Sequence, residues 1–159
     1  VDLYKVAMST RLMSSKTFFL PFNQGSNGPG VDGGAGNPQN PDGGYVTAYL
    51  WENVLQKDKF LDILQKFISY QKETKRIILP DGKIRTDVTE KIIFPRYHQL
   101  DVVRKLVQHT KDNGPGHNYL IQHSAGSGKS NSIAWTAYRL ASLHDTENKA
   151  IYNSVIKLT

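Results

Sequence analysis

The sequence predicts an α/β fold in which a strand, a loop, a helix and a second strand form a parallel βαβ unit. Three observations favour this fold. An apolar run, Asn118 to Gln122, precedes a glycine-containing loop; a helical pattern of apolar residues follows the loop; and Val155 to Leu158 has the composition of another strand. A right-handed crossover would place the two strands side by side in one sheet.

The loop itself, His123 to Ser130, contains the residue types that bind phosphate. Gly126 and Gly128 leave room for backbone N–H groups to turn toward anionic oxygens. Lys129 adds a cation, and Ser130 offers an oxygen to Mg²⁺. We therefore interpret the loop as a site for a nucleoside triphosphate with Mg²⁺.

The match to the usual phosphate-loop pattern is incomplete. The pattern G-x-x-x-x-G-K-[ST] requires a glycine at the position that His123 occupies. The alternative is an ordinary turn between a strand and a helix, in which Lys129 and Ser130 merely begin a solvated helix. Two glycines that bracket a serine just before a lysine favour the phosphate loop.

Composition sets broad limits on the class of protein. The chain has 159 residues, with 20 Lys and Arg against 14 Asp and Glu, and a net charge of +6 that suits an anionic partner. These charges are spread along the chain, so alone they are weak support for nucleic-acid binding. The absence of cysteine excludes disulfides and thiolate metal sites. No apolar run approaches the ~18 residues of a membrane span, and we expect a soluble intracellular protein.

The N-terminal part divides into two segments. In residues 1–23, the run Thr17 to Phe22 predicts a short buried strand, which we interpret as the end of a domain whose body lies upstream, because an isolated strand is marginal in water. Residues 24–44 are rich in Gly, Pro and Asn and predict a flexible surface loop. The alternative is that its amides and asparagines contact a DNA backbone or a neighbouring domain.

A helical connector and a hairpin are expected next. From Tyr45 to Gln71 apolar residues recur at helical spacing, which predicts one or two helices within a connector that spans residues 45–75. Pro80 to Gly82 is a turn signal between two strand-like runs, so residues 76–94 predict a hairpin. Its basic side chains form either a solvated surface or a DNA contact.

Residues 95–159 begin with a helix that ends near Asn113. Its first turn gathers Arg96, Tyr97 and Gln99, a group that can stack on adenine and read its edge. The alternative is that Tyr97 belongs to the core and Gln99 caps the helix. We expect His98 and His123 near the nucleotide, and we assign no metal site to the five histidines.

Two apolar stripes are predicted for the helices of this last segment. The first helix should bury Leu100, Val103, Leu106 and Val107, and the helix after the loop should bury Ile133, Ala134, Ala137, Leu140 and Ala141. No acidic residue after the loop is a credible second ligand for Mg²⁺, and no arginine is a credible partner for the phosphates. We therefore expect the chain to be a segment of a longer protein.

Five blocks of the chain closely resemble the restriction (R) subunit of type I restriction-modification enzymes: Phe18–Asn23, Ala35–Pro38, Thr47–Glu52, Ile93–Asp101 and His117–Ser130. They occur in the order of the family and span nearly the whole chain. The resemblance implies an N-terminal nuclease domain followed by two RecA-like motor domains of the superfamily 2 helicase type. In that family ATP hydrolysis pumps double-stranded DNA past the enzyme before cleavage.

The resemblance also implies roles for individual residues. Gln99, with Arg96 and Tyr97, would be the adenine-reading Q motif, and His123 in place of the first glycine is the form this family uses. Ala125, Gly126, Ser127, Gly128, Lys129 and Ser130 would form helicase motif I. Their backbone amides up to Lys129 would hold phosphate, Lys129 would act in catalysis by neutralising the charge of the β- and γ-phosphates, and Ser130 would hold Mg²⁺.

Under this interpretation the chain is the end of a nuclease domain and the first part of a RecA-like motor. Residues 1–23 match none of the nuclease residues of the family. The implied partners are double-stranded DNA and the methylation and specificity subunits, the implied compartment is the cytoplasm, and this segment alone should neither cut DNA nor hydrolyse ATP efficiently. Two alternatives are a P-loop helicase or NTPase with no restriction role, and a non-catalytic connector with a vestigial loop.

Overall fold

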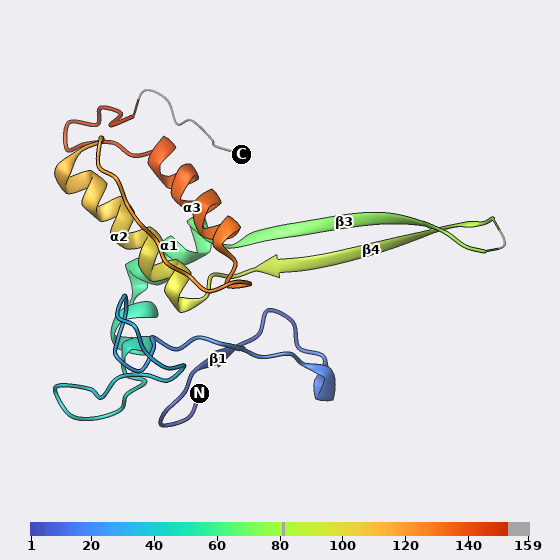
Figure 1. Cartoon of the computed structure of the whole chain (residues 1–159), viewed down its shortest axis with the longest axis horizontal. Helices are drawn as coiled ribbons and strands as arrows, with labels where there is room; N and C mark the ends of the chain where they lie inside the picture. Colours follow the sequence, from blue (N-terminus) through green and yellow to red (C-terminus); the bar gives the residue numbers. More distant parts are fainter. Residues whose placement is uncertain (81, 153–159) are drawn as a thin grey trace.

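The computed structural model describes residues 1–80 and 82–152, which form a mixed α and β structure (Figure 1). A short antiparallel pair, β1 (Ala7–Met8) with β2 (Leu20–Pro21), holds the N-terminal segment, and η1 (Ser14–Lys16) lies in the arm between them. The predicted strand Thr17 to Phe22 is therefore only partly formed. Phe22 is buried, but Phe18 is 76% exposed because no second strand or helix of the described residues covers it.

The glycine-rich segment is held in place by its asparagines and glutamine. The Asn23 side-chain amide donates to the Ala35 carbonyl oxygen at 2.9 Å, and that of Asn37 donates to the Tyr4 carbonyl oxygen at 2.9 Å. The Gln24 backbone N–H donates to Asn37 Oδ1 at 2.9 Å. The loop therefore folds back against the N-terminal segment. It contains no helix or strand and is mostly exposed, as predicted for a surface loop, and its flexibility stays a prediction.

Two short helices follow and confirm the predicted helical segment. These are η2 (Leu50–Val54), a π-helical turn, and α1 (Lys57–Lys66). Helix α1 ends at Lys66, earlier than the pattern predicts, because the chain turns into a strand at Ser69. Ile63 of α1 and Phe67 after it are fully buried and anchor the helix to the core.

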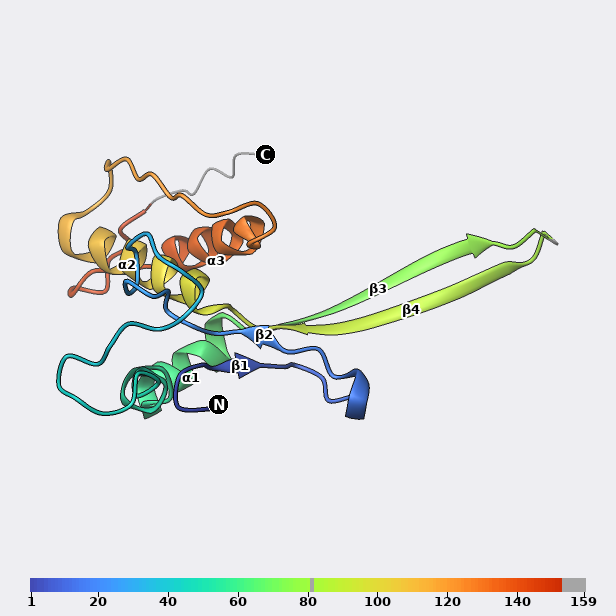
Figure 2. The same ribbon diagram turned by 60° about the horizontal axis from the view of Figure 1, so that its bottom comes forward.

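The predicted hairpin is confirmed, and it is longer than predicted. Strand β3 (Ser69–Ile78) pairs antiparallel with β4 (Ile84–Ile93), from Ser69↔Ile93 at the base to Ile78↔Ile84 near the tip. Figure 2 shows this ribbon projecting away from the helices. Every residue of β3 is exposed, so the ribbon is held mainly by its own hydrogen bonds and cross-strand pairs.

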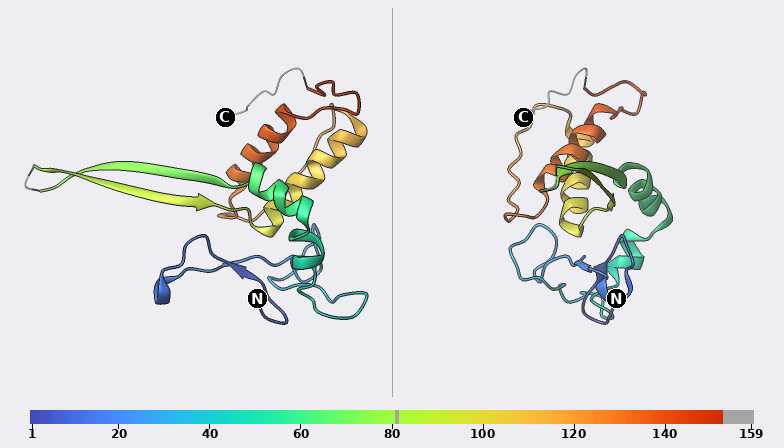
Figure 3. Two further views of the ribbon diagram at one scale, coloured as in Figure 1. Left: turned by 180° about the vertical axis from the view of Figure 1, so that it is seen from behind. Right: turned by 90° about the vertical axis from the view of Figure 1, so that its right-hand side faces the viewer.

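Helices α2 (Tyr97–Asn113) and α3 (Lys129–Ala141) lie side by side (Figure 3). The predicted span of α2 is confirmed, and Leu100, Val103 and Leu106 of its predicted stripe are buried. Asp62 of α1 fastens the three helices together. It accepts a hydrogen bond from Arg139 of α3 at 3.0 Å and pairs with Arg104 of α2 at 3.4 Å.

The buried face of α3 differs from the predicted one. Ser132 and Trp135 are its buried residues, whereas Ile133 is 62% exposed. Trp135 packs against Phe67 with ring centroids 5.6 Å apart, and this large aromatic contact sets the rotation of the helix. Ile133, Ala137 and Leu140 of the predicted face instead line an open groove of about 410 Å³.

The predicted strand before the loop, Asn118 to Gln122, is not formed. These residues are extended but unpaired, and Leu120 is 96% exposed. A strand needs a neighbour for its backbone hydrogen bonds, and both sheets of the described residues are two-stranded and antiparallel. The predicted second strand, Val155 to Leu158, lies outside the described residues, so within them the parallel βαβ unit is not formed.

Candidate nucleotide-binding site

A tight turn leads directly into α3, as the sequence predicts for the loop and the helix start. Gly126 (φ 72°) and Gly128 (φ 82°) both adopt left-handed backbone conformations that favour glycine, and Gly128 is the residue that caps α3. The first N–H groups of a helix have no partner within the helix and attract anions. The geometry suits a phosphate, and phosphate binding itself stays a prediction.

The side chain of Lys129 folds back over the loop. Its ammonium group donates to the carbonyl oxygens of His123 at 3.2 Å and Ser124 at 3.1 Å. Ser130, in the first turn of α3, is exposed. A phosphate would offer the ammonium group an ionised acceptor in place of neutral carbonyl oxygens, and the pair would gain Coulomb attraction.

Gln99 connects the start of α2 to the loop. Its side-chain amide nitrogen donates to the Gly128 carbonyl oxygen at 2.8 Å and to that of Ser127 at 3.3 Å. Its side-chain oxygen accepts from the backbone N–H of Arg96 at 2.8 Å, which caps α2. Gln99 thus caps α2, as the alternative predicted. The same side chain also hydrogen-bonds the predicted phosphate loop.

Tyr97 lies in the core and not in the site. It is 7% exposed, and its ring meets the rings of Phe22 at 5.7 Å and Tyr49 at 5.2 Å in edge-on contacts. Its hydroxyl accepts from the Gln24 side chain at 3.1 Å, and burial raises the pKa of Tyr97. The ring has no open face for a base in this structure, so the predicted stacking role is wrong here and the core alternative describes Tyr97.

One pocket of about 190 Å³ joins most of the other predicted residues. Arg96 and Gln99 from the start of α2 line it together with the turn residues 126–128. Its remaining lining residues are Met8, Thr10, Leu20, Ile92, Ile93, Phe94 and Asn131. Ala125, Lys129 and Ser130 lie beside this pocket in sequence but do not line it.

Two histidines flank the loop, and their expected position near a nucleotide stays a prediction. His98 Nε2 lies 3.1 Å from the Ser127 carbonyl oxygen, and the rings of His98 and His123 are 4.8 Å apart. Burial lowers the pKa of His98 despite its bond to Ser127. Burial, followed by the nearby charge of Lys129, lowers the pKa of His123. Both rings are therefore uncharged at neutral pH.

The structure also shows an unexpected feature of a predicted residue, Ser127, and it adds three site residues that sequence reasoning missed. Ser127 is 6% exposed, and its hydroxyl has no hydrogen-bond partner among the described residues. Met8, Thr10 and Leu20 reach the pocket from the N-terminal segment. From the sequence, Ser127 was expected to contribute only its backbone amide, and nothing in the sequence indicates that the N-terminal residues approach the loop.

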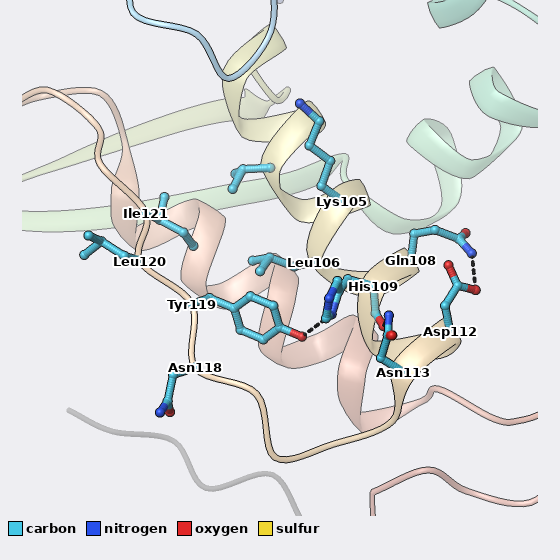
Figure 4. A pocket seen from close by; sticks show the side chains of 11 residues that line it. Lys105, Leu106, Gln108, His109, Asp112, Asn113, Asn118, Tyr119, Leu120 and Ile121 are labelled. Carbon is cyan, nitrogen blue, oxygen red and sulfur yellow. Dashed lines mark hydrogen bonds between the residues drawn. The ribbon is translucent and has the colours of Figure 1, made fainter.

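A larger pocket lies elsewhere, along the C-terminal half of α2 (Figure 4). It measures about 620 Å³ and lies between α2 and the extended residues 118–121. Tyr119 points its hydroxyl at His109 Nδ1, 3.0 Å away. None of the predicted site residues lines it, and the described part of the chain has no group of three or more His, Asp or Glu residues that could hold a metal ion.

Comparison of the chain with protein-family models, curated proteins and solved structures found no match. In addition, none of the helices in residues 1–80 and 82–152 has both the length and the apolar character needed to cross a bilayer. The functional conclusion therefore rests on the residues of the site and on their geometry.

Proposed function

We propose that this chain is a segment of the R subunit of a type I restriction enzyme, spanning the junction between nuclease and RecA-like motor, and that it binds ATP with Mg²⁺ through residues 125–130. One observation carries the proposal. Gln99 and the turn Gly126–Gly128, remote in sequence, line one pocket and are hydrogen-bonded to each other. If Gln99 only capped α2, it would not need to hydrogen-bond the turn Gly126–Gly128 as well.

The roles of the loop residues follow from phosphoryl-transfer chemistry. ATP supplies the reactive phosphates, and most of the protein's contribution is positioning and charge neutralisation. The free N–H groups at the start of α3 would hold phosphate oxygens, and Lys129 would neutralise their charge. Ser130 would give Mg²⁺ one oxygen ligand. Phosphate oxygens of ATP and water would give it most of the others.

Gln99 would link recognition of the base to the state of the loop. Both N–H donors of its side-chain amide are used by loop carbonyls in this structure. A base that bonds the same amide must compete with these carbonyls, so adenine binding would change how the loop is held. Arg96, on the same pocket wall, would add positive charge near the phosphates.

Double-stranded DNA and the methylation and specificity subunits are the partners included in this proposal, and the cytoplasm is its compartment. The net charge of +6 supports an anionic partner. On the ribbon, Lys72, Lys75 and Arg85 are paired with acidic residues, as the distances 3.2, 3.4 and 2.7 Å show. Arg76 and Lys91 have no ion-pair partner within residues 1–80 and 82–152, which makes the ribbon the best candidate for a phosphate contact.

Substitution of the loop lysine tests the proposal. We expect Lys129→Ala to weaken Mg²⁺–ATP binding, measured by calorimetry, roughly 10- to 100-fold, because a charge-assisted bond contributes about 1.5–3 kcal/mol. In the full-length protein it should abolish translocation and cleavage. Lys111→Ala, an exposed lysine in the last turn of α2, is the matched control and should bind ATP normally. Retained ATP-dependent cleavage by the Lys129 variant would refute the assignment.

A non-catalytic connector is the second candidate. It is favoured by the internal bonds of Lys129 to loop carbonyls and by the capping role of Gln99. A connector with a vestigial loop predicts no Mg²⁺-dependent ATP binding by the wild-type chain, and the same titration therefore separates the two candidates.

A further inference from the structure

The 190 Å³ pocket beside the loop has a wall that comes from the N-terminal segment. Met8 is in β1, Leu20 is its paired residue in β2, and Thr10 lies in the arm after β1. The N-terminal segment and the loop before α3 thus line one pocket, even though the glycine-rich loop, the connector and the ribbon separate them in sequence.

The chemistry of the pocket is divided between its walls. Met8, Leu20, Ile92 and Phe94 give it apolar sides. The opposite wall is formed by the turn 126–128 and by Gln99, whose peptide and amide groups are polar. Flat heteroaromatic bases combine apolar faces with hydrogen-bonding edges, so these walls suit a base. Arg96 also lines the pocket, and its positive charge would attract the phosphates that the base carries.

The size of the pocket points to the same ligand class. Sites for drug-sized ligands span about 300–1,000 Å³, and this pocket is smaller, so it fits one ring system and not a whole nucleotide. The phosphate-type turn borders it directly. A base in the pocket would therefore have its phosphates beside Gly128 and the start of α3.

We propose that Met8, Thr10 and Leu20 close the base pocket of the nucleotide site, so that the segment before the glycine-rich loop contacts the base of ATP. This inference rests on the proposed nucleotide-binding function. It makes the N-terminal segment a part of the nucleotide site, and base binding therefore tightens its contact with the loop.

The test compares a ligand that has a base with one that has none. The probes are ATP and inorganic tripolyphosphate, each with Mg²⁺, titrated into the whole chain. Thr10→Trp places a large ring at an exposed position that lines the pocket, and Leu12→Trp places the same ring in the same arm at a residue that is 80% exposed and does not line it. We expect Thr10→Trp to weaken ATP binding about tenfold and to leave tripolyphosphate binding unchanged. Leu12→Trp should change neither.

The possible failures are distinguishable. If the wild-type chain binds neither probe, the proposed function and this inference both fall. If Thr10→Trp binds ATP as the wild type does, only the inference is overturned. Met8→Ala is the second variant. It removes part of the apolar wall and should weaken ATP binding a few-fold, and an equal loss of tripolyphosphate binding would show that the whole loop is disturbed and would overturn the assignment.

Discussion

At the scale of single residues, the contact between Gly128 and Gln99 decides the geometry of the candidate site. Gly128 has a positive φ, and a Cβ atom there would lie 2.5 Å from the Gln99 amide nitrogen. Gln99 is 3% exposed and is bonded to the Arg96 N–H and to loop carbonyls, so it cannot move aside without breaking them. Gly126 has a similar φ, but its Cβ would meet nothing within 4 Å.

This difference predicts unequal effects of two alanine substitutions. Gly126→Ala should cost about 1–2 kcal/mol of stability from backbone strain alone. Gly128→Ala should cost about 1–3 kcal/mol more, because it also displaces a buried, hydrogen-bonded amide. Urea unfolding measures both variants, and Gln99→Ala in the Gly128→Ala background should recover part of the difference. Equal losses for the two glycines would show that the Gln99 contact is unimportant.

The two histidines beside the loop predict a dependence of stability on pH. Burial lowers the pKa of both His98 and His123 below the ordinary value of 6.5, so the unfolded chain binds more protons than the folded chain just below that pH. Their contribution to stability is therefore present above about pH 6.5 and is lost as the pH falls. We expect the urea concentration at the unfolding midpoint to decrease as the pH is lowered from 7.5 to 5.5.

A double substitution, His98→Asn with His123→Asn, serves as the control for this titration. Asparagine does not titrate, so the variant should show a flatter midpoint over the same range, even if it is less stable throughout. A wild-type midpoint that does not change from pH 7.5 to 5.5 would contradict the assignment of low pKa values to these rings.

At the scale of elements, an aromatic cluster joins three parts of the chain. Phe22 of the N-terminal segment packs against Tyr97 of α2, and Tyr49 before η2 packs against the same ring. The Tyr49 hydroxyl donates to the Phe22 carbonyl oxygen at 2.5 Å. These contacts hold β1 and β2 near α2, and they therefore also hold Met8 and Leu20 at the pocket.

Removing the Phe22 ring should separate these parts. Phe22→Ala is expected to cost about 3–5 kcal/mol, the usual loss for a buried phenylalanine. Phe18→Ala, at an exposed ring in the same segment, should stay within about 0.5 kcal/mol of the wild type. Chemical unfolding measures both, and a small effect of Phe22→Ala would show that the N-terminal segment is held by other contacts.

The elements also show which structure local sequence can and cannot predict. Helix α2 and the ribbon follow from periodicity and a turn signal, which are local properties, and both were predicted. The prediction of a strand at residues 118–122 was wrong because a strand needs a neighbouring strand to pair with, and a local apolar run does not supply one. The prediction of the buried face of α3 was wrong because Trp135 packs against Phe67, and these two residues are remote in sequence.

The same limit applies to the candidate site. The turn at Gly126 and Gly128 and the position of Gln99 follow from short motifs with a physical basis. The burial of Tyr97 does not, because it depends on Phe22 and Tyr49, which approach it only in the folded chain. Thr10 carries no local signal at all, and only the fold brings it to the pocket.

At the scale of the whole molecule, the ribbon of β3 and β4 stands apart from the core (Figure 1). Its ten-residue strands extend roughly 30 Å, at about 3.4 Å per residue. Only its base, at Ile93, packs against the core cluster. Its outer part can therefore change without affecting the packing of the helices.

Shortening the ribbon tests this independence. Replacement of residues 74–88 by Asn-Gly, between the paired residues Glu73 and Thr89, should leave the thermal midpoint of the core within about 2 °C. The deletion removes Lys75, Arg76, Lys83 and Arg85, so binding to duplex DNA, measured by fluorescence anisotropy, should weaken and depend less steeply on salt. Unchanged DNA binding would exclude the outer part of the ribbon as the phosphate contact, and a large loss of core stability would contradict its independence.

The place where the ribbon joins the body gives it a mechanical meaning. Strand β4 runs without interruption into Ile92, Ile93 and Phe94, and these residues form part of the pocket wall next to Gln99. The base of the hairpin is therefore part of the pocket for which we propose nucleotide binding. A force on the far end of the hairpin, from a DNA duplex or another subunit, would act on the same few side chains that line this pocket.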